Sequence, residues 1–508
     1  MLLIYPPLAK PSEPPAGITR LSGALASHGV RHALLDANLE GILFLLGEAA
    51  GQLRSSQDTW TRRCLRNLPR NLSALRDIKT YRILDRYKRA VEDVNRVIEQ
   101  SCIARGSSVS LANYQSNTFS AARSTDLLRA AENPEQNPFY EYFEKRLSQT
   151  IEREKPEVVG ISLTYLSQSH CAFALMGYLR RRFPDLKLVC GGGLITSWMR
   201  RPGWNNPFAG LIDICIDGPG EAALLALTGA APGIVSNYVP NYASLSLHEY
   251  LSPGLILPYS ASSGCFWNRC SFCPEHAEDN KYLPVASQRA VEELSFLTQQ
   301  LNPSLLHLLD NAVSTALMKS LIACPPGIPW YGFARIGKEL TDTAFCEALK
   351  KSGCVMLKLG IESGDQSVLD ALSKGINVEM ASKALRSLRN AGIATYVYLL
   401  FGTPAEALPE ARKTLEFTER NADAISFLNL AIFNMPVGTS DAEKYGTAAF
   451  YEGDLSLYTD FEHPAGWGRR QVRLFLDGEF RRIQAVSAIL KKQPSYFTSN
   501  HAPFFTMA

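Results

Sequence analysis

The sequence predicts an α/β protein in which a doubly wound domain precedes a partial (β/α)6 barrel. Two observations favour this fold class. Short apolar runs typical of buried strands alternate with amphipathic helical stretches in two separate blocks of the chain, and strands that alternate with helices pair in parallel. A chain of 508 residues is also too long for one ordinary hydrophobic core, so two or three domains are expected.

The first block, residues 1–232, contains a long insertion. The runs MLLIY and HALLDAN are predicted strands on either side of a helix, and the pattern resumes with EVVGISLTYL at residues 157–166. Two more strands lead into a GGG loop and a GPGE turn, whereas residues 40–150 are polar and mostly helical. Ligands bind beyond the carboxyl ends of parallel strands. These loops are therefore candidate ligand loops, although their glycines can also serve only to make tight turns.

The second block, residues 250–440, repeats one strand–helix unit six times. Its first apolar run is LILPYSAS and its last is AISFLNLAIF. Six such units fit a curved, partly open parallel barrel that is shorter than the eight-fold version. The less regular residues 441–508 are predicted to form a small C-terminal extension.

The composition indicates a soluble globular protein of a reducing cytoplasm. Hydrophobic residues make up 46% and charged residues 20% of the chain, and the formal net charge of +3 predicts no nucleic-acid partner. No apolar run reaches about 18 residues and no basic segment precedes the N-terminal apolar run, so neither a membrane span nor a signal peptide is expected. Eight of the eleven cysteines are scattered singly, unlike those of a disulfide scaffold.

The insertion carries a concentration of positive charge. Residues 61–90 hold ten Lys and Arg against two Asp. A solvated helical face is the favoured interpretation of this segment. The alternative is a lid or a docking surface for an acidic substrate or protein partner.

Three cysteines lie close together in SSGCFWNRCSFCPE, in the loop that follows the first barrel strand. Cys265, Cys270 and Cys273 have the spacing C-x4-C-x2-C, and this loop belongs to the catalytic rim of such barrels. Structural zinc takes four protein ligands, for which only His276 and the distant Cys324 are further candidates. Three thiolates on a 4Fe–4S cluster would leave one iron open to another ligand. A three-ligand zinc site and three buried structural cysteines remain the alternatives.

These cysteines, with GIESGDQSVLDALSKG and LFGTPAE, resemble the radical S-adenosylmethionine (SAM) superfamily, and specifically its subgroup with an N-terminal, Rossmann-like cobalamin-binding domain. Loops of that domain recur here in the same order, at Tyr5–Gly17, Gly160–Ser169, Gly191–Gly193 and Gly218–Glu221. The resemblance covers roughly residues 1–40 and 155–440. One departure is the spacing, because C-x3-C-x2-C is the commonest in the superfamily. The additional residue indicates a divergent branch.

The resemblance implies a 4Fe–4S cluster held by the three cysteines, with SAM bound to the open iron. It places Phe272 at the adenine, Glu362 and Ser363 at the ribose, Asp310 near the methionyl amine and Arg335 at the SAM carboxylate. Three of these residues also have a structural interpretation. Phe272 can pack the loop, Ser363 can cap a helix, and Arg335 can form a salt bridge at the barrel rim. No catalytic residue that contacts the substrate is assigned.

The resemblance also implies a corrin bound by the loops of the first domain, where small residues allow backbone amides to approach the ring. The residues expected there are Pro6, Pro7, Ser162, Thr164, Gly191, Gly192, Gly193 and Glu221. No D-x-H-x-x-G pattern occurs, so no histidine is predicted to bind cobalt from below.

The resemblance implies a radical SAM enzyme, with cobalamin-dependent methyl transfer to an unactivated carbon as the leading hypothesis. The first alternative is a radical rearrangement or cyclisation without methyl transfer. A non-catalytic cobalamin or iron–sulfur sensor or carrier is the second. A small electron donor such as flavodoxin or ferredoxin is the implied partner, and the substrate is a small molecule or a peptide.

Overall fold

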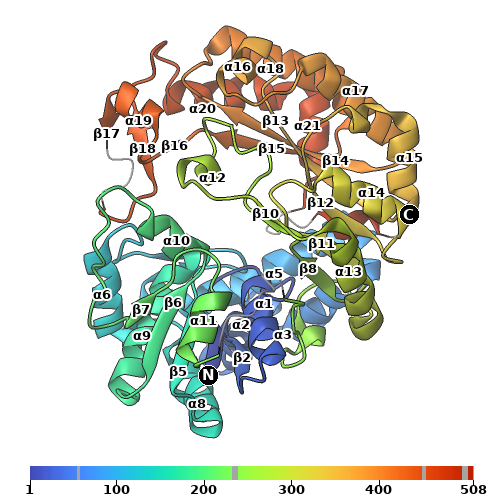
Figure 1. The fold of residues 1–508 in the computed structure, drawn as a ribbon. Helices are drawn as coiled ribbons and strands as arrows, with labels where there is room; N and C mark the ends of the chain where they lie inside the picture. The colour runs from blue at the N-terminus through green and yellow to red at the C-terminus, as the bar shows by residue number, and fades with distance from the viewer. Residues whose placement is uncertain (54–57, 231–237, 449–452, 495–500, 507–508) are drawn as a thin grey trace. The chain divides into compact units, whose positions relative to one another are not determined.

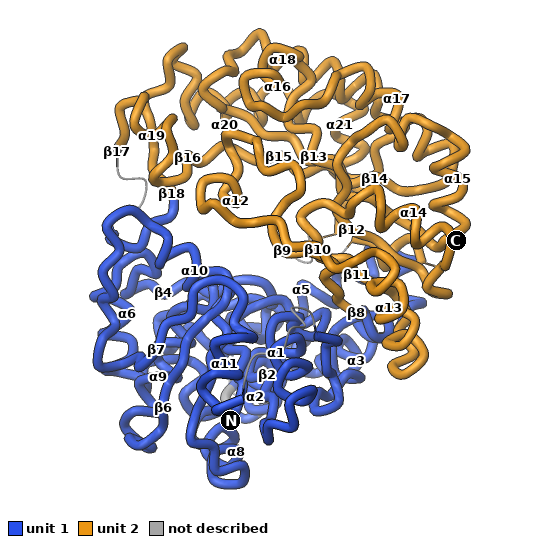
Figure 2. The backbone as a smooth tube through the Cα atoms, viewed as in Figure 1, with its two compact units in different colours: residues 1–256, 451–457, 495–497 blue, residues 257–450, 458–494, 498–508 orange. Residues whose placement is uncertain are grey.

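The computed structural model describes the chain except for residues 54–57, 231–237, 449–452, 495–500 and 507–508 (Figure 1). The chain divides into two compact units, shown in different colours in Figure 2. Unit 1 is built mainly from residues 1–256, and unit 2 from residues 257–450 and 458–494. Both units contain a parallel sheet with helices, so the α/β fold class is confirmed. The predicted boundaries of three separate domains stay a prediction.

Unit 1 contains a five-stranded sheet in the order β2-β1-β5-β6-β7, and every pairing in it is parallel. The strands are β1 (Leu2–Tyr5), β2 (Ala33–Asp36), β5 (Val158–Ser162), β6 (Lys187–Gly191) and β7 (Ile214–Cys215). The connecting helices are α1 (Ala16–Ser27), α9 (Ser169–Arg182), α10 (Gly193–Met199) and α11 (Glu221–Leu227). Because the chain goes from β1 to one side and then crosses to β5 on the other, the strand order reverses between these two strands, where doubly wound sheets bind ligands.

The insertion is helical, as predicted. It contains α2 (Ala37–Gln52), α3 (Thr59–Arg76), α4 (Ile78–Tyr81), α5 (Leu84–Cys102), a hairpin of β3 (Ser107–Val109) and β4 (Tyr114–Ser116), α6 (Ser124–Glu132), α7 (Tyr140–Tyr142), a π-helical turn (Phe143–Leu147) and α8 (Ser148–Glu154). Helices α3 and α5 are joined through the buried carboxylate of Asp93, which accepts hydrogen bonds from Arg63, Cys64 and Asn71 at 3.1–3.2 Å. This satisfies a charge that would be costly to bury alone.

The positive segment of the insertion is largely solvated. Of its ten basic residues, eight have exposed side chains, and Arg76 donates to the carbonyl oxygen of Glu249. Such exposure is what the favoured interpretation of a solvated helical face requires.

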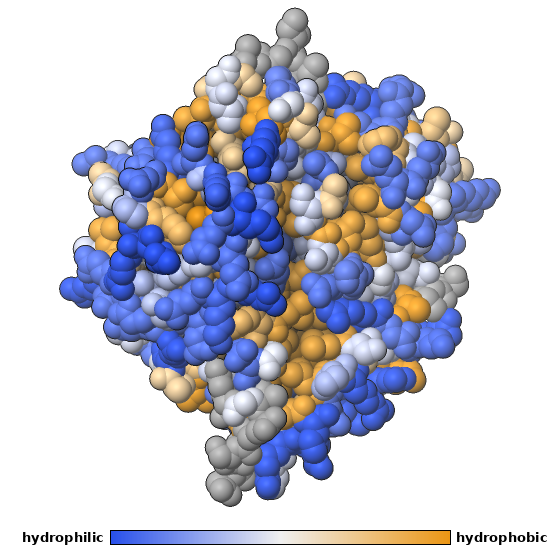
Figure 3. Space-filling view, turned by 90° about the horizontal axis from the view of Figure 1, so that it is seen from below, coloured by the Kyte–Doolittle hydropathy of each residue, from blue (hydrophilic) through white to orange (hydrophobic). Residues whose placement is uncertain are grey.

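Figure 3 shows one face of the molecule, on which hydrophilic side chains surround smaller apolar patches.

Unit 2 contains a six-stranded sheet in the order β15-β14-β13-β12-β11-β8. The strands are β8 (Ile256–Tyr259), β11 (Leu305–Leu308), β12 (Trp330–Ala334), β13 (Cys354–Glu362), β14 (Ala394–Phe401) and β15 (Phe427–Ile432). The helices between them are α13 (Ser287–Leu301), α14 (Thr315–Ala323), α15 (Thr343–Lys351), α16 (Gln366–Ala371), α17 (Val378–Asn390) and α18 (Leu408–Arg420). Each strand of this sheet lies next to the strand that follows it along the chain, as in a barrel that stops short of closure.

The C-terminal segment packs on this sheet within unit 2. It contains α19 (Ser440–Lys444), a small sheet of β16 (Met435–Pro436), β17 (Thr447–Ala448) and β18 (Tyr458–Phe461), then α20 (Arg469–Gly478), α21 (Gln484–Lys491) and a 3₁₀ turn (Ala502–Phe505). The fully buried ring of His501 lies 4.6 Å from Tyr396 of β14 and 4.5 Å from Phe427 of β15, centroid to centroid. These residues therefore cover the early part of two strands.

A search of the described helices found none with the length and apolar character that crossing a membrane requires.

Gly192, which precedes α10, has a backbone conformation that only glycine adopts without strain. Its φ is +103° and its ψ is 172°, and an added Cβ would lie 2.6 Å from the carbonyl oxygen of Leu163. Gly192→Ala should lower the free energy of unfolding by about 3 kcal/mol, measured by chemical denaturation. Gly193→Ala is the matched control, because its nearest neighbour would be 3.8 Å away. An equal loss in both variants would contradict this account.

Candidate functional site

The loop of the three cysteines folds back on itself next to the barrel sheet. Its entry strand β9 (Ser262–Ser263) pairs with β10 (Leu283–Pro284), which leads the chain away from the loop. At the turn, Gly264 has a φ of +71°, and an added Cβ would meet the carbonyl oxygen of Lys281. Cys265, Cys270 and Cys273 are free thiols and are half-buried. The short helix α12 (Pro274–Ala277) starts directly after the third of them.

The loop is attached to the turn that follows α16. The indole Nε1 of Trp267 donates to the carbonyl oxygen of Ser373 at 3.0 Å, and the amide of Ser271 donates to that of Leu372 at 3.1 Å. Gly375 is required at this contact, because an added Cβ would collide with the indole ring. The backbone of Asn268 and Ser373 has positive φ, which is uncommon for residues other than glycine. This strain is held by the contact between the two segments.

The surroundings of Cys270 and Cys273 shift the pKa of each thiol by two effects of opposite direction. Burial raises the pKa of Cys270, and the positive charges of Lys374 and Arg335 act against this. Burial raises the pKa of Cys273 to about 11, although the backbone amides of Glu275 and His276 donate toward its sulfur. Metal ligation needs the thiolate. The nearby cations and amides therefore favour the form in which these residues would bind iron.

Cys265, Cys270 and Cys273 are the thiol donors that a 4Fe–4S cluster would need. Within the part of the chain that the structure describes, no three His, Cys, Asp or Glu side chains converge on one point as the ligands of one ion do. Cys265, Cys270 and Cys273 would hold such a cluster through three irons and leave the fourth without a protein ligand.

Glu362, at the end of β13, lies beside this loop and is paired with Lys374. Their charged atoms are 2.8 Å apart and both side chains are about a tenth exposed. Glu362 has a φ of +69°, a conformation that concentrates at functional sites when it is found outside glycine. Gly360 makes room for the pair, since an added Cβ would lie 2.5 Å from the Glu362 carboxylate. Lys374 also lies 5.6 Å from the ring centroid of Phe272.

Lys374 was missed by the sequence reasoning, although it stands inside the motif GIESGDQSVLDALSKG. It follows Glu362 by twelve residues, with helix α16 between them, so no periodicity relates the two. The sequence showed only that Lys374 stands between Ser373 and Gly375. The structure shows that these two neighbours are the residues that contact Trp267.

Ser363 is fully buried and its hydroxyl is used inside the fold. It lies 3.1 Å from the hydroxyl of Thr414 on α18 and accepts the amide of Asp365. The residue that caps α16 is Asp365, which accepts the amide of Val368 and pairs with Lys413 at 2.6 Å. The helix-capping alternative considered for Ser363 therefore falls to Asp365.

Asp310 and Arg335 follow neighbouring strands but have different surroundings. Asp310, which is 2% exposed, accepts the hydroxyl of Ser262 at 2.5 Å and the amide of Ala261 at 3.1 Å, and burial raises its pKa. It lines a cavity of about 270 Å³ together with Tyr282. Arg335 is half-buried, and its guanidinium carbon lies 3.8 Å from the centroid of the Trp267 ring. The rim salt bridge proposed for it is replaced by this stacking.

Further polar groups that the sequence did not assign lie on the strands of unit 2. Lys358 of β13 is 1% exposed and donates to His307 of β11 at 3.1 Å, while the His307 ring stacks on Tyr331 at 4.3 Å. Alternation could not tell which way the later strands face. The structure brings the rings of Tyr396 and Tyr398 within 4.8 Å of each other.

The loops at the strand-order reversal of unit 1 are held together by Gln168, which is fully buried. Its side-chain oxygen accepts the amides of Thr164 and Tyr165, and its amide group donates to the carbonyl oxygen of Pro6 at 2.7 Å. The hydroxyl of Ser167 donates to the carbonyl oxygen of Leu8. The loops that follow β1 and β5 are therefore fixed to each other by these hydrogen bonds.

The residues expected to bind a corrin lie at these strand ends. Pro6, Pro7 and Ser162 are buried, Gly191 accepts the amide of Leu163, and Glu221 pairs with Arg20 at 2.5 Å. Two large apolar residues next to Thr164 were missed. Tyr165 and Leu166 are 54% and 45% exposed, and exposed apolar groups beside a ligand loop indicate a contact surface.

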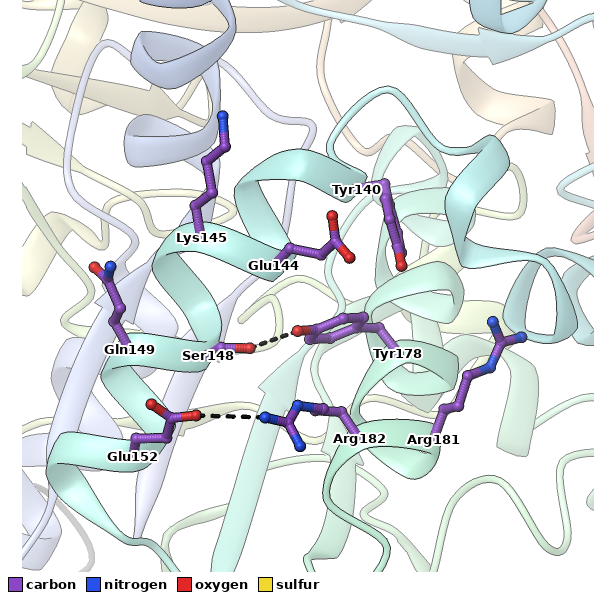
Figure 4. A pocket seen from close by; sticks show the side chains of 9 residues that line it. All are labelled: Tyr140, Glu144, Lys145, Ser148, Gln149, Glu152, Tyr178, Arg181 and Arg182. Carbon is purple, nitrogen blue, oxygen red and sulfur yellow. Dashed lines mark hydrogen bonds and ion pairs between the residues drawn. The ribbon is translucent and has the colours of Figure 1, made fainter.

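A surface groove of about 390 Å³ lies elsewhere in unit 1, between the π-helical turn, α8 and α9 (Figure 4). The hydroxyls of Ser148 and Tyr178 are 2.5 Å apart there, and Arg182 pairs with Glu152 at 3.8 Å. Helices α8 and α9 end just before β5 and β6. The groove is therefore at the amino-terminal edge of the sheet, opposite the candidate ligand loops.

No family model matches the chain. An uncharacterized methyltransferase of Pyrococcus horikoshii is 24% identical over 311 residues, which cover 54% of this chain and 66% of that protein. The anaerobic magnesium-protoporphyrin IX monomethyl ester cyclase of Rubrivivax gelatinosus is 25% identical over 217 residues, 39% of either chain. The chain thus spans 66% and 39% of the length of these two relatives.

Two solved structures are similar over most of the chain. The radical SAM methyltransferase TsrM of Kitasatospora setae, with cobalamin and a [4Fe-4S] cluster bound, gives a TM-score of 0.51 at 16% identity and covers 87% of this chain and 77% of its own. The cobalamin-dependent radical SAM enzyme OxsB, with aqua-cobalamin bound, gives 0.50 at 14% identity over 70% of this chain and 61% of its own. This chain has the fold of the cobalamin-dependent radical SAM enzymes. The resemblance noted in the sequence is thereby confirmed at the level of the fold.

In this radical SAM fold, the sequence LFGTPAE lies at the end of β14 and contacts the C-terminal segment through a hydrogen bond. Glu406 is 1% exposed, and one of its oxygens accepts the amide of Gly402 at 2.5 Å and the indole of Trp467 at 3.0 Å. Its other oxygen has no hydrogen-bond partner among the described residues. Burial raises the pKa of this carboxyl to about 7.

This buried carboxyl should make stability depend on pH. The folded chain keeps the proton of Glu406 up to about pH 7, whereas the unfolded chain loses it near 4.5, so the free energy of unfolding should fall as the pH rises across this window. The loss should be at most about 3 kcal/mol, and Glu406→Gln should abolish it. Chemical denaturation from about pH 5 to about pH 8 measures both slopes. Equal slopes in the two proteins would refute the assignment.

Proposed function

We propose that the chain is a cobalamin-dependent radical SAM enzyme whose reaction is methyl transfer to an unactivated carbon. The observation that carries the proposal is the arrangement in unit 2. Three half-buried thiols lie on a loop attached beside a Glu362–Lys374 pair at the carboxyl ends of the barrel strands. The candidate ligand loops of unit 1 lie in the same chain, and the similar structures bind cobalamin.

When bound, a three-thiolate 4Fe–4S cluster supplies the electron that cleaves SAM, and cobalamin carries the methyl group that is transferred. In the proposed site, Cys265, Cys270 and Cys273 would hold the cluster, and its iron without a protein ligand would be available to SAM. Glu362 accepts from the ribose hydroxyls, and Lys374 pairs with that carboxylate at 2.8 Å. Phe272 lies beside Lys374, where it would contact the adenine. Ser363 supports Glu362 through its buried bond to Thr414.

The loops of unit 1 would hold the corrin. Gln168 fixes the backbone of Thr164 and Tyr165. The exposed side chains of Tyr165 and Leu166 would therefore offer the corrin an apolar surface on a backbone that is already ordered before binding. Pro6 and the glycines after β6 bring backbone groups close to that surface. A small electron donor such as flavodoxin or ferredoxin would supply the reducing electron.

A second candidate is a radical cyclisation without methyl transfer. The specific observation in its favour is the similarity to anaerobic magnesium-protoporphyrin IX monomethyl ester cyclases, at 25% and 26% identity in two organisms. Anaerobic reconstitution followed by product analysis separates the two. Methyl transfer gives both S-adenosylhomocysteine and 5′-deoxyadenosine, whereas cyclisation gives 5′-deoxyadenosine alone. Neither product from a cluster-containing protein would contradict both candidates.

Cys270→Ala should abolish reductive SAM cleavage, because two thiolates do not hold the cluster with a single open iron. The measurement is the yield of 5′-deoxyadenosine with dithionite, together with iron and sulfide content. Cys324→Ala is the control, since Cys324 is exposed and stands at the end of α14. Cleavage at the normal rate by the Cys270 variant would remove the cluster assignment. Zinc in place of iron in anaerobically purified protein would do the same.

A further inference from the structure

Arg335 is a half-buried cation beside the cysteine loop. It follows β12, and its guanidinium donates to the carbonyl oxygen of Lys374 and stacks on Trp267, 3.8 Å from the ring centroid. No carboxylate pairs with it among the residues that the structure describes. Burial lowers the pKa of Arg335, and the charges that act in the opposite direction are those of Cys270 and Cys265. Its guanidinium therefore lies against the cysteine loop, on a ring two residues after Cys265.

The other cations near the loop are compensated or solvated. Lys374 has Glu362 at 2.8 Å, so this pair contributes little net charge. Arg269 is exposed, and its guanidinium carbon lies 5.3 Å from the centroid of the Trp267 ring. A charge in bulk water is screened, whereas a half-buried one acts at a lower effective dielectric constant. Among the described residues near this loop, Arg335 is the half-buried cation for which no ion pair with a carboxylate is found.

Trp267 determines where this charge lies. It is one of the four residues between Cys265 and Cys270, the interval that is one residue longer than the commonest spacing. Its indole is fixed by the hydrogen bond to Ser373 and by contact with Gly375. Arginine stacks on aromatic rings and remains charged when partly buried. The longer loop thus provides an aromatic ring that holds a cation beside the cysteine loop.

We propose that Arg335 is the counter-charge of the thiolate-held cluster, positioned by Trp267, and that it raises the reduction potential of that cluster. The inference rests on the proposed function, because it presupposes a cluster on the three cysteines. Reduction adds one negative charge to a group that already carries three thiolates. A fixed cation stabilises the reduced state more than the oxidised state. In this role Arg335 acts on electron uptake and does not bind the SAM carboxylate.

Arg335→Gln should lower the reduction potential, measured by a redox titration of the reconstituted protein followed by electron paramagnetic resonance in the absence of SAM. At the wild-type midpoint potential, the ratio of reduced to oxidised cluster should fall about tenfold, which corresponds to a shift of about 59 mV for one electron. Arg335→Lys should recover part of the shift because it retains the charge. Arg269→Gln is the matched control, and its potential should equal that of the wild type.

The role of Trp267 is tested by two further variants. Trp267→Ala removes the platform and should shift the potential in the same direction as Arg335→Gln. Combining both substitutions should add nothing to the larger single effect, since both act through one cation. Trp267→Phe keeps a stacking ring and should shift the potential less than Trp267→Ala. If Arg335→Gln binds no cluster, Arg335→Lys and the Trp267 variants decide the question.

Each result has one meaning. A wild-type protein that binds no iron–sulfur cluster overturns the proposed function and this inference with it. A normal wild-type cluster whose potential is unchanged in Arg335→Gln overturns the inference alone. Weaker SAM binding by Arg335→Gln at an unchanged potential also overturns it, and assigns Arg335 to the SAM carboxylate. A lowered potential in Arg335→Gln, with an unchanged one in Arg269→Gln, supports the inference.

Discussion

The docking of the cysteine loop on the turn after α16 is the interaction on which the candidate site depends. A loop with three thiols has no regular secondary structure of its own, so its geometry comes from outside it. Two hydrogen bonds from Trp267 and Ser271, and the absence of a side chain at Gly375, fix it to the segment that also carries Lys374. The same segment thus positions the thiols, the Glu362–Lys374 pair and the guanidinium of Arg335.

Much of the fold could be predicted from the sequence because it depends on local patterns. Apolar runs of strand length marked the strands of both parallel sheets, and the polar composition of the insertion marked its helices. The three cysteines were found by spacing alone. Glu362 was found by its motif, and its positive φ and its burial at the end of β13 fit a site residue. In these cases the signal lies within a few residues.

The features that could not be predicted are contacts between distant segments. Gln168 bonds to Pro6 across 162 positions of sequence, and Lys358 bonds to His307 across 51. A buried lysine also contradicts the ordinary rule that such residues face solvent. Ser363 is a further contact of this kind. The sequence placed it in the right motif, but its hydroxyl is engaged by Thr414, a residue that no local pattern connects with it.

The packing of His501 on Tyr396 and Phe427 has a consequence for the order in which the barrel is completed. Both strands emerge from the ribosome well before the residues that cover them. Until then, the rings of Tyr396 and Phe427 are exposed to water or to chaperones on the side that His501 later covers. The packing of these two strands is therefore completed only when the residues around the 3₁₀ turn have been synthesised, although that turn adds no strand to the barrel sheet.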